Sequence, residues 1–140
     1  MALGGRDAAG TAGAAEKLLY TSSPRVADAR AKLGPVATVV DGGHRVRMRR
    51  LTEDLADRGV GRLMVEGGGT VHTQFLADDL VDELQLVVAP VFIGDSAAPR
   101  FVRDGHFPWN AGRRATLAEV RPIGDVVLLR YALSPRFEDG

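Results

Sequence analysis

Strand-like and helical segments alternate along the first half of the chain. Three short apolar segments are each followed by a segment with helical spacing or helix-end residues. The apolar segments are 17–22, 36–40 and 62–66, and the helical ones are 23–34, 47–61 and 70–79. This alternation is typical of a parallel sheet whose strands are joined by crossover helices.

The pattern changes in the second half of the chain. Residues 81–94 form a long extended segment with a proline near its end, and residues 115–133 contain two strand patterns joined at "IGD", which is a hairpin signal. The sequence therefore predicts an α/β domain. Its sheet is expected to be mostly parallel, with helices on both faces and a C-terminal antiparallel hairpin.

The predicted helices carry start and stop residues. Ser23 can cap the first helix, Pro24 suits its first position, and Gly34 suits its end. Gly59 similarly predicts the end of the second helix.

Composition narrows the class of protein. The 140 residues correspond to one ordinary domain, expected over residues 17–140 after a flexible Ala- and Gly-rich lead-in at 1–16. Eighteen basic residues balance 18 acidic ones, which argues against a nucleic-acid or membrane-surface protein. The chain has no cysteine, so disulfides, thiolate zinc sites and a cysteine nucleophile are excluded, and a reducing cytoplasm is expected. No apolar run approaches the roughly 20 residues that cross a bilayer.

The glycine run after the third predicted strand is the main candidate site. Glu66 ends that strand, and Gly67, Gly68 and Gly69 lead into a helix. Parallel sheets bind ligands at the carboxyl ends of their strands, glycines let backbone approach a ligand, and a helix N-terminus attracts phosphate. A turn that only lets helix and strand pack remains the alternative.

Two other loops occupy the corresponding position after earlier strands. Ser22, Ser23 and Arg25 follow the first strand and can hold a phosphate, such as the 2′-phosphate of NADPH, although helix capping also accounts for Ser23. The "DGG" at 41–43 follows the second strand and either lines the same crevice or forms a plain turn.

The sequence predicts no metal site. The three histidines lack metal-ligating spacing, and His72, near the start of the glycine-run helix, either faces a ligand or is a surface group. The acidic residues between 78 and 83 are interrupted by apolar ones, which favours a solvated turn. No nucleophile or proton donor can be assigned from spacing.

Several motifs in order resemble the C-terminal reductase domain of the bifunctional riboflavin-biosynthesis deaminase-reductase, over about residues 17–133. The resemblance is carried by Arg58-Gly59-Val60, Glu66-Gly67-Gly68, Leu80-Val81-Asp82-Glu83-Leu84, Ala89-Pro90 and Phe92-Ile93-Gly94. It implies a dihydrofolate-reductase-like fold and NADPH-dependent reduction of 5-amino-6-(5-phosphoribosylamino)uracil to its ribitylamino product.

The resemblance also implies roles for individual residues. It makes Glu66 a substrate contact. It places a hydroxyl of Thr21, Ser22 or Ser23 against NADPH. The glycine-run residues that it assigns to the cofactor are Gly67, Gly68, Gly69, Thr70, Val71, His72 and Thr73.

Family members carry a further half-domain before the matched region, so the chain is expected to be the C-terminal part of such a domain. A homodimer in the cytoplasm is also expected from the family. Two alternatives stay open: a catalytically inactive nucleotide-binding or dimerising fragment, and a reductase that acts on a pteridine.

Overall fold

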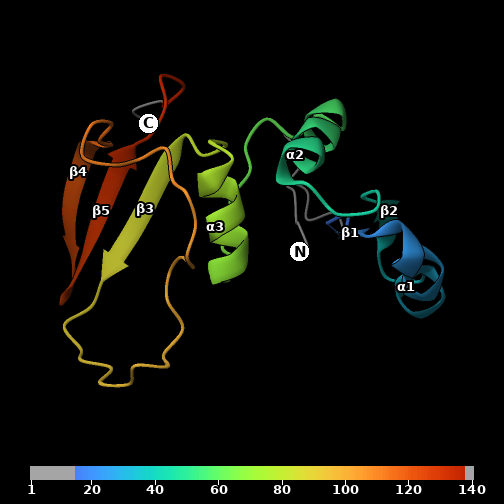
Figure 1. Ribbon diagram of the computed structural model, residues 1–140, viewed down its shortest axis with the longest axis horizontal. Helices are drawn as coiled ribbons and strands as arrows, with labels where there is room; N and C mark the ends of the chain where they lie inside the picture. Colours follow the sequence, from blue (N-terminus) through green and yellow to red (C-terminus); the bar gives the residue numbers. More distant parts are fainter. Residues whose placement is uncertain (1–14, 138–140) are drawn as a thin grey trace. The chain divides into compact units, whose positions relative to one another are not determined.

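The computed structural model describes residues 15–137, and these fall into two compact units that divide between Val65 and Glu66. Residues 1–14 of the predicted lead-in lie outside the described range. Figure 1 labels the helices and strands of both units.

The first unit is a parallel strand pair with helices. It contains β1 (Leu18–Thr21), a short 3₁₀ turn η1 (Ser23–Arg25), α1 (Val26–Leu33), β2 (Thr38–Asp41) and α2 (Met48–Asp57). The two strands pair in register from Leu18 opposite Thr38 to Thr21 opposite Asp41. Because parallel neighbours need a crossover, α1 connects them, as the sequence predicted.

Apolar side chains at strand and helix spacing form the interior of this unit. Met48, Leu51 and Leu55 recur at intervals of three and four residues and are all buried, as the amphipathic pattern of α2 predicts. Gly59 follows the helix with a φ of 85°, which confirms its predicted role as a stop.

The second unit contains one helix and an antiparallel sheet. Its elements are α3 (Gly69–Ala77), β3 (Glu83–Val88), β4 (Thr116–Ile123) and β5 (Val126–Ala132), with β5 in the middle of the sheet. The predicted hairpin is confirmed: Ile123 pairs with Val126 across a two-residue turn in which Gly124 has a φ of 62°.

An ion-pair cluster spans all three strands of this sheet. The Arg130 guanidinium on β5 donates to Glu83 on β3 at 2.7 Å and to Glu119 on β4 at 3.0 Å. The Arg130 side chain is only 14% exposed, and the two carboxylates raise its pKa above the ordinary arginine value. One cation therefore links the central strand to both of its neighbours.

The α/β class is confirmed, with a parallel and an antiparallel sheet, but one predicted strand is wrong. Residues 62–66 pair with no strand in either sheet of the described chain. Leu63 and Val65 are half-buried while Met64 is 68% exposed. Burial therefore alternates along this segment as in a strand, but its backbone makes no strand pairing. A strand forms only where another strand presents its free N–H and C=O groups, and a local pattern cannot supply that partner.

No helix among residues 15–137 is long and apolar enough to cross a membrane.

Leu55 is 2% exposed and provides a test of the first unit's core. We expect Leu55→Ala to lower the free energy of unfolding by about 2–5 kcal/mol, because it removes buried methyl groups and leaves a cavity. Val36→Ala is the control, since Val36 lies in the same unit and is 61% exposed; it should change stability by less than about 0.5 kcal/mol. Urea unfolding followed by circular dichroism measures both, and equal effects would contradict the assigned core.

Candidate nucleotide-binding site

The glycine run forms a left-handed turn directly before α3. Gly67 has a φ of 51° and Gly68 a φ of 86°, a region that side-chain-bearing residues adopt at a cost. The Gly68 carbonyl accepts the first helical hydrogen bonds, from the N–H groups of Val71 at 2.9 Å and His72 at 3.1 Å. The earliest N–H groups of α3 have no partner within the helix, so this terminus suits a negatively charged group.

The three glycines meet different surroundings. A Cβ on Gly67 would lie 2.4 Å from Nε2 of His72, and one on Gly69 would lie 2.6 Å from the carbonyl oxygen of Arg100. A Cβ on Gly68 would meet no protein atom within 4 Å. Packing within the chain therefore requires glycine at the outer two positions, and only Gly68 leaves open space against its backbone.

The side chains of His72 and Thr73 hold the loop around residues 100–105 against α3. Nδ1 of His72 lies 3.2 Å from the carbonyl oxygen of Phe101, and the two rings are 5.1 Å apart. The Thr73 hydroxyl donates to the Gly69 carbonyl at 2.6 Å and accepts the Arg103 N–H at 2.7 Å. His72 and Thr73, both predicted to contact the cofactor, thus already make hydrogen bonds within the chain. A contact with a ligand would be additional to these bonds.

The other predicted residues of the glycine run lie near the surface. Glu66 and Thr70 are exposed, and Val71 is half-buried. These three residues flank Gly68, whose backbone is open to solvent.

In the first unit, the loops after β1 and β2 are joined by hydrogen bonds. Ser23 was expected to cap a helix, and that prediction is wrong: its hydroxyl donates to Oδ1 of Asp41 at 2.8 Å, and no side-chain cap is formed. The same carboxylate oxygen accepts the Gly43 N–H at 2.8 Å, and the Ser23 N–H donates to the Gly43 carbonyl at 2.8 Å. Ser22 is half-buried at the start of η1.

Asp41 belongs to the "DGG" segment at 41–43, but the sequence did not predict that its carboxylate joins the two loops. The hydroxyl of Ser23 and the N–H of Gly43 hold the pKa of its carboxyl below the ordinary value. Its position at the end of a parallel strand is the signal for a role in ligand binding, because such carboxylates face the crevice where α/β sheets bind nucleotides.

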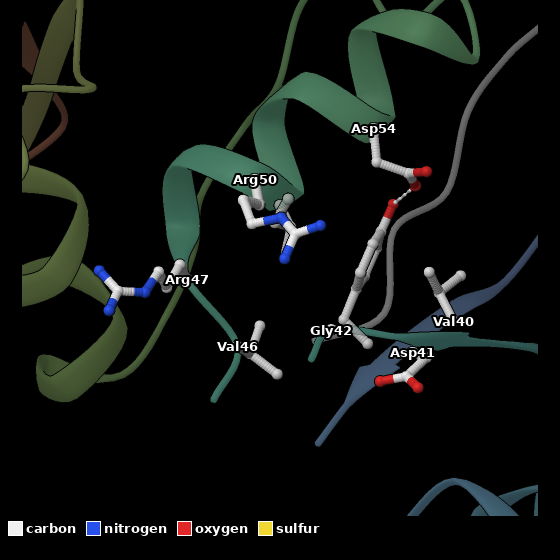
Figure 2. Close-up of a pocket in the computed structure, with 9 residues that line it drawn as sticks. Val40, Asp41, Gly42, Val46, Arg47, Arg50 and Asp54 are labelled. Carbon is white, nitrogen blue, oxygen red and sulfur yellow. Dashed lines mark hydrogen bonds between the residues drawn. The ribbon is translucent and has the colours of Figure 1, made fainter. Parts of the chain in front are cut away.

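A pocket of about 110 Å³ opens beside these loops. Its walls are the ends of β1 and β2, the turn at 41–46 and the first two turns of α2. Figure 2 shows the hydrogen bond at one side of the pocket, from the Tyr20 hydroxyl to Oδ2 of Asp54 at 2.5 Å. Burial and this carboxylate raise the pKa of Tyr20 to about 12, so its hydroxyl stays protonated at neutral pH.

The acidic residues 78–83 contact basic and polar side chains. Asp79 pairs with Arg113 at 2.9 Å, and Asp82 accepts from Ser134 and from Arg136. Within residues 15–137, no group of three or more metal-ligating side chains lies together.

The α/β fold and the glycine turn before α3 are those of a ligand-binding α/β protein, and comparison with known proteins identifies its family. Residues 7–129 match the family model described as the RibD C-terminal domain. The chain belongs to that family, and its relatives are pyrimidine reductases.

Two archaeal relatives are named 2,5-diamino-6-ribosylamino-4(3H)-pyrimidinone 5′-phosphate reductase. The one from Archaeoglobus fulgidus is 36% identical over 98 residues, covering 70% of this chain and 41% of the relative. The one from Methanothermobacter thermautotrophicus is 38% identical over 110 residues, covering 78% and 50%. The riboflavin biosynthesis protein RibD of Chlamydia muridarum is 30% identical over 95 residues, covering 68% and 25%. The chain thus spans half or less of the length of these relatives.

Solved structures share the fold. A pyrimidine reductase-like protein from Corynebacterium diphtheriae superposes with a TM-score of 0.67 at 21% identity, over 82% of this chain and 49% of that one. RibD from Acinetobacter baumannii gives a TM-score of 0.61 at 23% identity, over 82% and 30%. The fold is therefore the dihydrofolate-reductase-like fold of the pyrimidine reductases.

The contact between Gly67 and His72 can be tested by a double-mutant cycle. Gly67→Ala should lower the free energy of unfolding by about 1–3 kcal/mol, because alanine is strained at positive φ and its methyl group displaces the imidazole. In a His72→Ala background there is no imidazole to displace. The loss of unfolding free energy caused by Gly67→Ala should then be smaller by at least about 0.5 kcal/mol. Denaturant unfolding measures all four proteins, and strict additivity would show that the two residues do not touch.

Proposed function

We propose that the chain acts in NADPH-dependent reduction of a phosphoribosylaminopyrimidine in riboflavin biosynthesis, converting the ribosyl group to ribityl. The observation that carries the proposal is the turn at Gly67–Gly69. Its central residue has open space, and it leads directly into the N-terminus of α3. Membership in the RibD C-terminal family and relatives named as reductases support it.

The residues present fit a nicotinamide dinucleotide. The first turn of α3 offers N–H groups and a partial positive charge to a pyrophosphate, and Gly68 lets that group approach the backbone. In the proposal, Gly67, Gly69, Thr70, Val71, His72 and Thr73 complete this contact surface. Ser22 and Ser23 are further proposed cofactor contacts, and the Ser23 hydroxyl is already positioned by Asp41. The bound cofactor supplies the hydride, and the chain supplies binding and orientation.

The substrate is proposed to be 5-amino-6-(5-phosphoribosylamino)uracil. The archaeal relatives favour its 2,5-diamino-pyrimidinone counterpart as the second candidate, because that compound appears in their names. Both carry the same phosphoribosylamino group, and a substrate panel that contains both separates them. Glu66 is the proposed substrate contact, since it is exposed immediately before the glycine turn.

The proposal includes a homodimer in the cytoplasm, which follows from the family resemblance. Light scattering coupled to size-exclusion chromatography measures the oligomeric state directly.

Gly68→Ala tests the cofactor site, and Gly59→Ala is a matched control. Gly59 has a φ of 85°, Gly68 has a φ of 86°, and a Cβ on either meets no protein atom within 4 Å, so both substitutions place alanine at positive φ without a clash. Only the methyl group at 68 would project where the proposed cofactor lies. We expect Gly68→Ala to weaken NADPH binding at least about tenfold and Gly59→Ala to leave it within about twofold. Fluorescence titration with NADPH measures both, and parallel losses would remove the glycine turn from the site.

Glu66→Ala tests whether Glu66 contributes to substrate binding and not to cofactor binding. We expect it to raise the dissociation constant of the pyrimidine substrate at least about tenfold, because a polar partner is lost, while NADPH affinity stays nearly unchanged. Calorimetric titration with each ligand provides the measurement. A comparable loss for both ligands would contradict the assigned role.

A further inference from the structure

The strand β3 and the segment after it form an exposed stretch without charge. Residues 84–94 carry no acidic or basic side chain. None of residues 84–88 is buried, and Val87 and Val88 are 56% and 50% exposed. Beyond the strand, Phe92 is fully exposed. Because single chains seldom leave a continuous apolar stretch in water, this segment is a candidate interaction surface.

β3 also has an unpaired backbone edge. It borders β5 on one side, and no strand of the described chain borders it on the other (Figure 1). Within the same residues, no backbone hydrogen bond joins residues 84–88 to a segment other than β5. Natural sheets often protect such an edge with a charged side chain, a bulge or a proline, and residues 84–88 contain none of these. The edge can therefore pair with another strand.

The side chains of this edge fit a second copy of the same strand. Two identical strands can pair antiparallel about a twofold axis, so that each position faces a position of the same segment. With Leu86 on the axis, Leu84 of one copy faces Val88 of the other, and Gln85 faces Val87. No charge then faces a like charge. A partner recognised through opposite charge would find no charged group on this stretch.

The apolar side of β3 continues across its own sheet. Leu86 lies opposite Leu129 on β5, which lies opposite Val120 on β4, and Val88 lies opposite Val127. Directly opposite residues share a face of the sheet. Val120 is 56% exposed and Val127 is 37% exposed. Pairing of two β3 edges would therefore join two apolar surfaces into one across six strands.

The size of a stable interface indicates that more than the strand takes part. Such an interface buries about 800 Å² on each partner. Five paired residues form a strip only about 17 Å long, at about 3.4 Å per residue. Val91, Phe92 and Ile93 follow the strand directly and are among the most exposed apolar residues of the described chain. They supply the additional apolar surface that the strip lacks.

We propose that residues 84–88 pair antiparallel with the same residues of a second copy, with Leu86 opposite Leu86. Pro90 has no N–H group and ends this pairing, and Val91, Phe92 and Ile93 pack against the partner beyond it. The surface belongs to the homodimer of the proposed function, so the inference rests on that part of it.

Val87→Lys tests the pairing in the full chain. It places an ammonium group on each of the two edges, and lysine is a residue that keeps natural edges apart. We expect the dissociation constant of the dimer to rise at least about tenfold. Val36→Lys is the matched control, because Val36 is also an exposed valine, at 61%, but lies in the first unit. It should change the dissociation constant by less than about twofold.

Sedimentation equilibrium over a range of protein concentrations measures the dissociation constants, and circular dichroism checks that both variants keep the fold. A dimer that Val87→Lys and Val36→Lys weaken equally, or that neither weakens, would overturn the proposed surface.

Leu86→Cys tests the register independently. The chain has no cysteine, so the introduced thiol is the only one present. A short bis-maleimide should link most Leu86→Cys chains into covalent dimers, because the two thiols face each other across the axis. Val36→Cys is the control and should stay largely unlinked. Equal linking of both variants, read on a denaturing gel, would overturn the register.

Failure of the surface and failure of the reductase function give different results. If the unaltered chain dimerises but neither variant at β3 behaves as expected, only the surface is lost. If the unaltered chain is a monomer at every concentration, the homodimer and its surface are both lost, and NADPH titration still decides the cofactor site. If the expected dimer forms but NADPH does not bind, the surface is supported and the reductase function is lost.

Discussion

The parallel pairing of β1 with β2 is the constraint on which the first unit depends. Parallel neighbours cannot be joined by a tight turn, so the chain must cross over through α1. The crossover brings the carboxyl ends of both strands to the same edge, where Thr21 lies opposite Asp41. This arrangement lets the Ser23 hydroxyl donate to the carboxylate of Asp41, 18 residues away, and so joins the loops after β1 and β2.

The three glycines of the run differ in whether packing inside the chain or space for a ligand explains them. Gly67 and Gly69 are required by contacts inside the chain, with His72 and with the backbone at Arg100. Gly68 has no such contact and leaves room for another molecule. A glycine motif can therefore serve both internal packing and ligand approach, and only the fold shows which glycine serves which.

Much of the local structure was predictable because it depends on near neighbours. The stop of α2 before Gly59, the crossover of the first unit and the turn at Gly124 follow from helical spacing, glycine position and strand alternation. Residues 62–66 show the limit, since they carry a strand pattern but lack a partner strand. The partners of Ser23 and His72 also escaped prediction, because they lie 18 and 29 residues away and depend on how the loops return.

The single arginine at the centre of the second sheet has a consequence for how that sheet comes apart. Glu83 and Glu119 lie on opposite neighbours of β5, and Arg130 is the cation that faces both. When either outer strand separates, the guanidinium loses one of its two carboxylates and keeps the other. The remaining pair then carries no net charge, whereas the separated carboxylate returns to water. Loss of Arg130 would remove the cation that both carboxylates share and leave Glu119 its pair with Arg121 on β4. Both outer strands would then be weakened by one substitution.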